Sequence, residues 1–332
     1  MLLRLAALLD MARANMDLAR FWRSLAGPLS LRTIAAAALM TLGCIVSLPS
    51  LAEAPAPWPI RTRERIALVN ELDFRLRSAV LPSACRKQAP VLGAEFDAIS
   101  NYAVSDRAAI AQLLALHEHP QAVAVAEGSP AAIAGLAVGD DILSINGKAP
   151  AQLPAVGGLT LSDRVHDRIV EQLSSGPVKL LIKRGGALKE LVIAPRLLCP
   201  GHANLSTARN VTSHEGGNEI LVTAGMVDFT RSTDELALVM GHEFAHVFLG
   251  HDKAKSLGIR MQMERDADVL GAAIARCAGY DVAKALSFWD RFGARDKFAF
   301  LKLPTHDKAS TRKQRLLAYV QETQAQCPLA AL

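Results

Sequence analysis

The segment from Ser232 to His251, STDELALVMGHEFAHVFLGH, constrains this chain more than any other. It places His242 and His246 four residues apart, with Glu243 directly after the first histidine. Residues four apart lie one above the other on the same face of an α-helix, so both imidazoles can reach a single metal ion. The H-E-x-x-H pattern is typical of a helical zinc site, in which the glutamate can take a proton from bound water.

The residues around this pattern favour a helix. Ser232 and Glu235 form the S-x-x-E pattern of a capping box, and Gly250 is suited to ending the helix. Apolar surface is supplied by Leu236, Ala237, Val239 and Met240. A short pattern also arises by chance, and a buried helix with two hydrogen-bonded histidines is the alternative interpretation. The rest of the chain has to decide between them.

A third ligand is needed, because catalytic zinc sites hold three protein ligands and leave one position for water. Residues 263–268, MERDAD, contain an E-x-x-A-D pattern within a run of helical periodicity. Glu264 and Asp268 share a helix face, so Glu264 can complete the site with His242 and His246. Asp268 can then accept a hydrogen bond from a liganding imidazole and fix its orientation.

This ligand set has two alternatives. An acidic, solvated helix face is one, but the apolar run that follows Asp268 favours an inward orientation for that side chain. A third histidine ligand of the metzincin type is the other, and it is disfavoured because Gly250 and His251 miss the required spacing.

The N-terminal residues 1–52 have the layout of a secretory leader. An apolar run over 33–48 follows Arg20, Arg23 and Arg32, and small residues precede a cleavage position after Ala52. An uncleaved membrane anchor through 33–51 and lipidation at Cys44 are the alternatives. In each case the sequence predicts export to the periplasm or cell envelope, with a possible association with the membrane.

Composition limits the partners. The 332 residues are 51% hydrophobic and 21% charged, which is typical of a globular protein. No basic cluster with interleaved aromatic residues accompanies the formal charge of +5, so nucleic-acid binding has no support.

Four cysteines follow the leader: Cys85, Cys199, Cys277 and Cys327. An even number in an exported chain indicates two disulfide bonds, with three possible pairings. Cys85 and Cys199 bracket one region and the other two lie in the C-terminal part, which favours pairing within each set. No C-x-x-C pattern indicates a cysteine zinc site.

Residues 119–196 read as a series of short strands and turns. Gly128-Ser129-Pro130-Ala131, Gly139-Asp140 and the hairpin signal Asn146-Gly147 are its clearest signals. The segment 127–150 resembles the core signature of a PDZ domain of the bacterial protease type. The resemblance implies a β-rich domain inserted between residues 53–118 and 197–332. A PDZ domain binds an extended peptide or a chain end by strand addition, whereas a spacer or dimerisation insert is the alternative.

A strand over 219–223 precedes the predicted metal helix. By analogy with other zinc proteases, this strand is expected to offer its edge to the substrate backbone, through Ile220, Leu221 and Val222. His202, Asn210 and His214 lie among turn residues without ligand spacing, and they are interpreted as surface residues.

ELALVMGHEFAHVFLGH followed by E-x-x-A-D resembles family 48 of the metallopeptidases, the HtpX-type and CAAX prenyl endopeptidase family. The segment Leu303-Pro304-Thr305-His306 with Arg312 is similar to the family's T-H-P-S-x-x-x-R motif, with Asp307 in place of proline. The resemblance implies an α+β fold with a mostly helical gluzincin-type domain. It also implies that His306 and Arg312 lie near the substrate oxyanion.

These observations together predict a zinc endopeptidase with one Zn2+ per chain, bound by His242, His246 and Glu264, and with Glu243 as general base. Polypeptides are the expected substrates, in particular misfolded or unfolded proteins of the envelope. A processing protease with one membrane substrate, and a non-catalytic PDZ adaptor with a structural zinc, are the alternatives.

Overall fold

The computed structural model describes residues 56–216, 218–251, 256–295, 306–322 and 326–332. The chain divides into two compact units, Met1–Pro55 and Ala56–Leu332, and the description concerns the second. The predicted leader, its cleavage position and Cys44 lie outside the described residues, as do Leu303, Pro304 and Thr305. None of the described helices has both the length and the apolar content needed to cross a bilayer.

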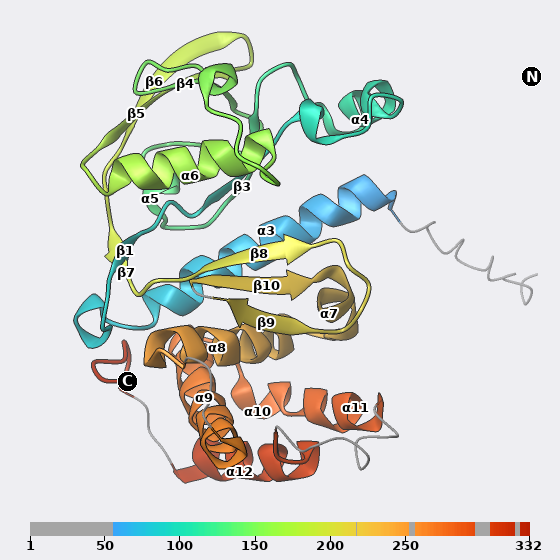
Figure 1. Ribbon diagram of the computed structural model, residues 1–332, viewed down its shortest axis with the longest axis vertical. Helices are drawn as coiled ribbons and strands as arrows, with labels where there is room; N and C mark the ends of the chain where they lie inside the picture. Colours follow the sequence, from blue (N-terminus) through green and yellow to red (C-terminus); the bar gives the residue numbers. More distant parts are fainter. Residues whose placement is uncertain (1–55, 217, 252–255, 296–305, 323–325) are drawn as a thin grey trace, which may run out of the picture. The chain divides into compact units, whose positions relative to one another are not determined.

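The part expected to be a peptidase, residues 56–88 and 197–332, is called the peptidase part; its described residues form a three-stranded sheet and a group of helices (Figure 1). Strand β10 pairs in parallel with β8 and antiparallel with β9, so that β10 is central. Helices α8 and α9 make the most extensive helix–helix contact of this part. The bounds of the main elements are α3 Trp58–Ser78, β8 His202–Ser206, β9 Ser213–Gly216, β10 Glu219–Thr223, α8 Thr233–Leu249 and α9 Leu257–Cys277.

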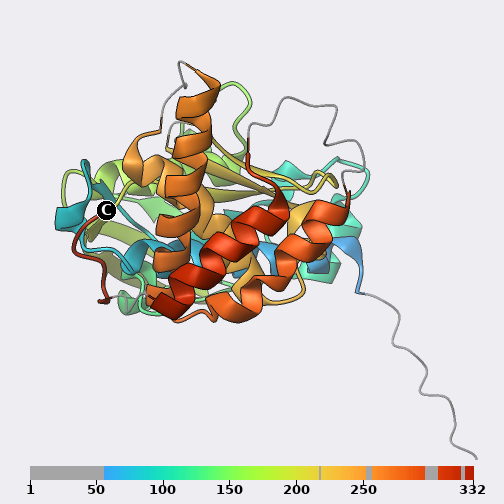
Figure 2. The ribbon, with the colours of Figure 1, turned by 90° about the horizontal axis from the view of Figure 1, so that it is seen from below.

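Shorter elements connect and cover this framework. Helix α12 packs against both α9 and α11, and Figure 2 shows these helices side by side. The bounds are η1 Pro82–Ala84, β1 Ala89–Pro90, β7 Leu197–Leu198, α7 Ala224–Phe229, α10 Val282–Ala285, α11 Ser287–Arg295 and α12 Ala309–Glu322.

A second, five-stranded sheet forms the PDZ part, in the order β2-β3-β4-β5-β6 with antiparallel neighbours. Helix α6 packs against β2 and β5. The bounds are β2 Ala94–Asp97, η2 Ile99–Asn101, α4 Arg107–Leu114, β3 Gln121–Val125, α5 Pro130–Ile133, β4 Asp141–Ile145, η3 Pro150–Gln152, α6 Leu161–Leu173, β5 Val178–Arg184 and β6 Ala187–Ile193.

The expected domain boundary at residue 119 divides this sheet and is therefore corrected. Strand β2 precedes the boundary, yet it pairs along β3 from Ala94 to Asp97. Leu92 and Phe96 are buried in the same hydrophobic cluster as Ile142 and Ile169 of the PDZ part. Strand β2 therefore belongs to the PDZ sheet, because its apolar side chains are buried in the core of that sheet.

The peptidase part has a hydrophobic core of its own. It includes Leu72 and Leu76 of α3, Ile220 of β10 and Phe244 of α8, none of which is exposed. The two sheets therefore have separate hydrophobic cores, as is usual for two domains within one chain.

Helix α8 begins and ends at the predicted signals. The Ser232 hydroxyl accepts a hydrogen bond from the backbone N–H of Glu235 at 3.3 Å, and Gly250 ends the helix in a left-handed conformation with φ 65°. The reciprocal half of the predicted capping box differs. The Glu235 carboxylate instead accepts from the Arg231 backbone N–H at 2.8 Å and pairs with Arg291.

Helices α8 and α9 approach closely at two glycines. A Cβ atom on Gly271 would lie 2.6 Å from the backbone nitrogen of His242, and one on Gly241 would lie 2.6 Å from the Gly271 carbonyl oxygen. Only glycine permits this separation, because each of these distances is far below a van der Waals contact. The contact sets how far α9 stands from the H-E-x-x-H residues.

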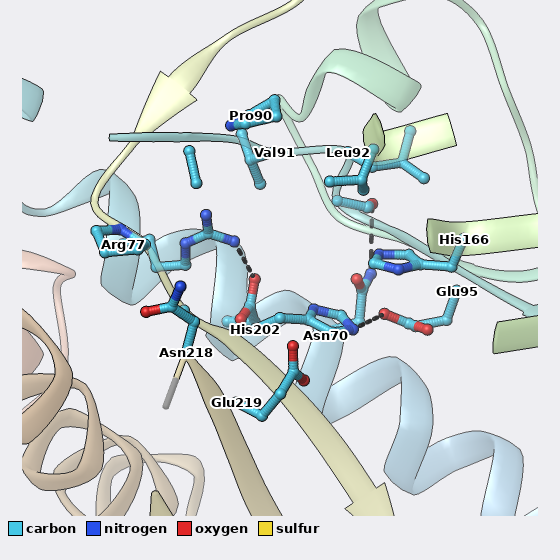
Figure 3. Close-up of a pocket in the computed structure, with 16 residues that line it drawn as sticks. Asn70, Arg77, Pro90, Val91, Leu92, Glu95, His166, His202, Asn218 and Glu219 are labelled. Atoms are coloured by element: carbon cyan, nitrogen blue, oxygen red, sulfur yellow. Dashed lines mark hydrogen bonds and ion pairs between the residues drawn. The ribbon is translucent and has the colours of Figure 1, made fainter. Parts of the chain in front are cut away.

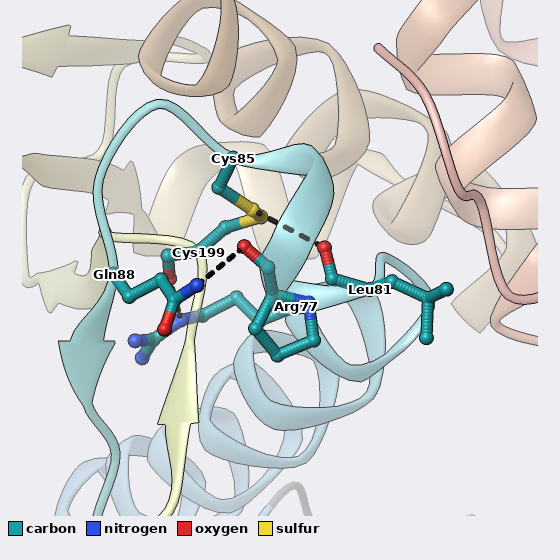
Figure 4. The surroundings of a disulfide bond; sticks show 6 residues. Arg77, Leu81, Cys85, Gln88 and Cys199 are labelled. Carbon is teal, nitrogen blue, oxygen red and sulfur yellow. Dashed lines mark hydrogen bonds between the residues drawn. A yellow bond between two sulfur atoms is a disulfide. The ribbon is translucent and has the colours of Figure 1, made fainter.

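Two disulfide bonds join Cys85 to Cys199 and Cys277 to Cys327, the pairing that the cysteine positions favour. Figure 4 shows the first, which ties the segment after α3 to β7. Beside it, Arg77 donates from Nε to the Cys199 carbonyl oxygen at 3.0 Å. The second ties the end of α9 to the C-terminal segment.

The role expected of strand 219–223 has to be corrected. Both of its edges are paired, so its backbone has no free groups for a peptide. Ile220 and Val222 point into the core and are fully buried, while Leu221 is partly buried. The edge strand on the side of α8 is β9, which contacts that helix.

Candidate metal centre

His242 and His246 on α8 and Glu264 on α9 converge on one point. The two Nε2 atoms lie 3.1 Å apart, and Glu264 Oε2 lies 3.3 Å from that of His242 and 3.5 Å from that of His246. The helical spacing aligns the imidazoles, and the glycine contact between the helices brings the carboxylate within reach. These three residues form a group of possible metal ligands.

The separations fit a tetrahedral ion. Ligand bonds of about 2.1 Å in a tetrahedron place the donor atoms about 3.4 Å apart. Glu264 Oε2 is also buried, and among the described residues none of its contacts has hydrogen-bond geometry. An oxygen shared between imidazole nitrogens in this way is suited to a metal ion, which would take up the lone pairs of all three groups.

The charges of the site also favour a cation. Burial opposes ionisation of Glu264, but the imidazoles of His242, His246 and His306 outweigh it and hold the pKa of that carboxyl well below its usual range. Burial likewise lowers the pKa of His242, but Asp268 and Glu264 outweigh it and raise the pKa to about 9. The surroundings therefore attract positive charge.

Asp268 holds His242 from behind. Its Oδ1 lies 3.1 Å from His242 Nδ1, which leaves Nε2 directed at the metal position. Fixing one ring nitrogen determines which nitrogen is available to the metal. Burial raises the pKa of Asp268, but His242 and Arg312 outweigh it and lower the pKa, so the carboxylate stays ionised.

Arg312 does not lie where the family resemblance places it. It is buried behind the site, where Nε donates to Asp268 at 2.9–3.1 Å and the guanidinium lies 3.8 Å over the Trp289 ring. A buried guanidinium committed to a carboxylate and an aromatic ring is not free to meet an oxyanion. Arg312 therefore acts as a positioning residue, because it orients the carboxylate that holds His242.

Glu243 lies next to the ligands and is 8% exposed. The Ser213 hydroxyl of β9 donates to its Oε1 at 2.7 Å. This bond fixes one carboxylate oxygen and leaves the other available for a proton. No pattern in the sequence points to Ser213, because the residue reaches Glu243 through the packing of β9 against α8.

His306 lies at the exposed side of the centre. Its Nε2 is 2.9 Å from Glu264 Oε2, and 46% of its side chain is exposed. The neighbouring Asp307 is bound by Arg265 of α9 at 2.9 Å and by Arg315 of α12. These two cations lower its pKa to about 2, Arg265 most strongly. The aspartate that replaces the family's proline thus ties the His306 segment to two helices.

The interpretation of His202 as a surface residue is wrong. His202 lies on β8, is only partly exposed, and belongs to a second group of possible ligands with Glu95 and His166. These residues come from distant segments, so no sequence spacing could connect them. The side chain of His214 lies outside the described residues.

Comparison with known proteins supports both parts of this architecture. Residues 210–261 match Peptidase family M48, and residues 121–171 match the PDZ domain family. No curated protein matches the chain. The M48 match covers β9, β10 and α8, and so includes Ser213, Glu243 and both histidine ligands.

Two solved structures are similar to the PDZ part. The HtrA3 PDZ domain bound to a phage-derived ligand is 19% identical, with a TM-score of 0.26, over 33% of this chain and 89% of that one. The HtrA-type protease AlgW with a decapeptide is 22% identical, with a TM-score of 0.26, over 35% of this chain and 31% of that one. The family matches identify an M48 peptidase segment at residues 210–261 and a PDZ domain segment at residues 121–171 of this chain.

Proposed function

We propose that the protein is a zinc endopeptidase of the bacterial cell envelope that cleaves misfolded or unfolded polypeptides. One observation carries the proposal. The donor atoms of His242, His246 and Glu264 have tetrahedral separations, with the carboxylate of Glu243 held beside them. Two imidazoles and one carboxylate are a donor set that suits zinc and leaves a position for water.

Zinc bound there would lower the pKa of a bound water toward about 7 and polarise the scissile carbonyl. The proton transfers are carried out by residues of the chain. Glu243 accepts the proton of the attacking water and passes it to the leaving amine. Ser213 holds one oxygen of Glu243, so that the other faces the water throughout.

His306 is suited to the substrate oxyanion. It lies within reach of the ligands and is half exposed, so its ring can turn toward a bound substrate. Hydrogen-bond donors aimed at a developing oxyanion typically contribute about 10²–10³-fold in rate. Asp268 and Arg312 do not contact the substrate in this mechanism. They keep Nε2 of His242 directed at the metal.

The substrate backbone is proposed to pair with β9. This strand forms one edge of the described sheet, and it carries Ser213, which contacts Glu243. An extended peptide added to this edge would run past the general base, and main-chain pairing places few demands on its side chains. That tolerance suits a protease for unfolded chains.

The PDZ part is proposed to capture a chain end or an extended segment. In the described sheet β2 is an edge strand, and α6 packs against it. Strand addition next to a helix is how PDZ domains take up peptides. Capture here would raise the local concentration of a substrate for the peptidase part.

Two observations favour catalysis over a structural metal. A structural zinc site is closed by four protein ligands and needs no base, whereas this centre has three and a carboxylate beside them. A narrow processing role on one membrane substrate remains the other candidate. Comparing envelope protein fragments with and without active enzyme would separate it from broad cleavage.

The test is digestion of an unfolded casein substrate by wild type and by Glu243→Gln, with zinc measured on the same samples. We expect full zinc content and a loss of activity of about 10²–10⁴-fold in the variant. Glu190→Gln, an exposed carboxylate on β6, is the matched control and should keep its activity. Retained cleavage by Glu243→Gln would refute the mechanism, and a mass measurement tests cleavage of the leader after Ala52.

A further inference from the structure

A cavity of about 140 Å³ lies between the PDZ part and the peptidase part, away from the catalytic centre. It is lined by residues 89–93, Glu95 of β2 and helix α6 on one side, and by α3, β8 and β10 on the other. Figure 3 shows Glu95, His166 and His202 gathered at one end of it, with Glu219 nearby. The proposed peptidase chemistry uses none of these side chains.

Three potential metal ligands lie close together in this cavity. Glu95 Oε1 lies 3.4 Å from His202 Nε2, which is the separation expected for two ligands of one tetrahedral ion. The rings of His166 and His202 stack with their centroids 4.3 Å apart. One ligand atom from each of the three residues lies within 4.8 Å of the other two.

Glu95 has a buried oxygen that the protein itself leaves without a hydrogen bond. Among the described residues, no donor reaches Oε1 with hydrogen-bond geometry. The neighbouring carboxylates differ. Asp73 accepts from the Ala203 backbone N–H at 2.8 Å and pairs with Arg77, and Glu219 accepts from the Asn204 side chain at 2.5 Å. A buried carboxylate oxygen without a donor is a place where a cation is expected.

The three side chains of the cluster differ in their protonation. Burial raises the pKa of Glu95 to about 7, even though His166 opposes the shift. Burial, and then the proximity of His166, hold the pKa of His202 well below its usual range, so its ring is neutral. Burial lowers the pKa of His166, but Glu95 and Asp167 outweigh it and raise the pKa. A divalent ion bound here would therefore displace a proton from His166, because neutral imidazole is the form that binds metals.

We propose that Glu95, His166 and His202 form a second zinc site, which links the PDZ part to the peptidase sheet. Glu95 lies on β2 and His166 on α6, both in the PDZ part, whereas His202 lies on β8. Two imidazoles and a carboxylate select zinc or a similar divalent transition metal. The ion fixes β2 and α6 against β8, which pairs along its full length with the central strand β10.

The site has a structural rather than a catalytic character. The cavity is lined by side chains of both parts. Two further carboxylates line it, but Asp73 is bound by Arg77 and the Ala203 N–H, and Glu219 by the Asn204 side chain, so neither is placed as Glu243 is beside the first centre. A metal that joins two separately packed cores adds stability to their interface by mass action. Zinc at this site therefore couples the orientation of the PDZ part to the peptidase part.

The experiment is zinc stoichiometry on the purified chain, first freed of metal with a chelator and then titrated with Zn2+ alone. His246→Ala empties the first centre, so that the second is measured by itself. We expect two zinc ions per wild-type chain, one in His246→Ala, and none in His246→Ala combined with Glu95→Gln. His117→Gln, an exposed histidine, is the matched control and should keep two.

A spectroscopic measurement covers the case in which a double variant fails to fold. Co2+ added to folded His246→Ala should give visible d–d absorption typical of tetrahedral nitrogen and oxygen ligands, and Zn2+ should abolish it by displacement. The proposal is overturned if His246→Ala binds no zinc and shows no such absorption. It is also overturned if Glu95→Gln leaves the second ion in place. Neither outcome depends on peptidase activity, which tests the other centre.

Discussion

His242, His246 and Glu264 form one cluster of two imidazoles and a carboxylate, and Glu95, His166 and His202 form another. The first draws two ligands from one helix and the third from the helix packed against it. The second takes its ligands from β2, α6 and β8, which belong to two different sheets and a helix. The same donor set is thus built in two ways, one by helical spacing and one by the meeting of two folded parts.

The clusters also differ in what surrounds them. Asp268 and Arg312 orient His242, and Ser213 holds the base Glu243. In the second cluster, the carboxylate of Asp167 lies 3.6 Å from His166 and is mostly exposed. Supporting hydrogen bonds fix ligands within the small tolerances that catalysis requires, whereas a structural ion tolerates a looser setting. We therefore propose that the support around a ligand set, more than the set itself, separates a catalytic centre from a linking one.

The largest effect is expected from removing a ligand of the first cluster. His246→Ala should reduce cleavage of unfolded casein to background, because two remaining ligands do not hold an active zinc ion. His117→Gln should keep wild-type activity. Activity assays with added zinc measure the difference, and substantial cleavage by His246→Ala would mean that chemistry occurs elsewhere.

The next effect is expected from the carboxylate behind His242. Asp268→Asn should weaken zinc binding at the first centre by about 10–100-fold, because the orientation of the imidazole is no longer fixed. Asp167→Asn, beside His166, should weaken zinc binding at the second site by less than about twofold. Competition with a zinc chelator gives both affinities. Equal losses in the two variants would show that the supporting carboxylates do not distinguish the two sites.

The contact between α8 and α9 predicts a smaller effect. Gly271→Ala should cost about 1–3 kcal/mol of unfolding free energy and lower zinc occupancy, because its Cβ would meet the backbone of His242. Gly258→Ala lies on the same helix with nothing near its Cβ, and it should change stability by no more than about 1 kcal/mol. Chemical denaturation measures the free energy of unfolding of both variants. An unchanged value for Gly271→Ala would show that the two helices can move apart.

The hydrogen bond to the general base predicts a modest effect. Ser213→Ala should lower kcat/KM about tenfold, which corresponds to about 1.4 kcal/mol, a typical value for a bond to a charged group. Zinc content should stay unchanged, because Ser213 contacts no ligand. Ser206→Ala, on the opposite strand β8, is the control. A loss of zinc in Ser213→Ala would assign the serine to metal binding instead.

The smallest effect is expected from Asp307. Its pKa is lowered from 3.8 to about 2 in the folded chain, so its ion pairs stabilise the protein above the ordinary aspartate pKa. This contribution is lost as the pH falls through about 2. The stability difference between wild type and Asp307→Asn should therefore be present at pH 7 and shrink between about pH 4 and pH 2. Thermal unfolding across that range measures it, and a constant difference would contradict the assignment.

The sequence alone determined the features that are local along the chain. The spacing of His242 and His246, the caps at Ser232 and Gly250, and the Asn146-Gly147 hairpin signal each depend on neighbours a few residues away. Backbone geometry then dictates the outcome, so helix α8 and the strands of the PDZ part could be predicted within a few residues. The M48 and PDZ assignments rest on the same local patterns.

Only the tertiary structure decided which distant groups meet. It placed β10 in the centre of its sheet, turned Arg312 toward Asp268 and away from the substrate side, and included β2 in the PDZ sheet. Glu95, His166 and His202 lie near one another for the same reason. Such contacts depend on how apolar faces pack against each other, and no spacing along the sequence records that packing.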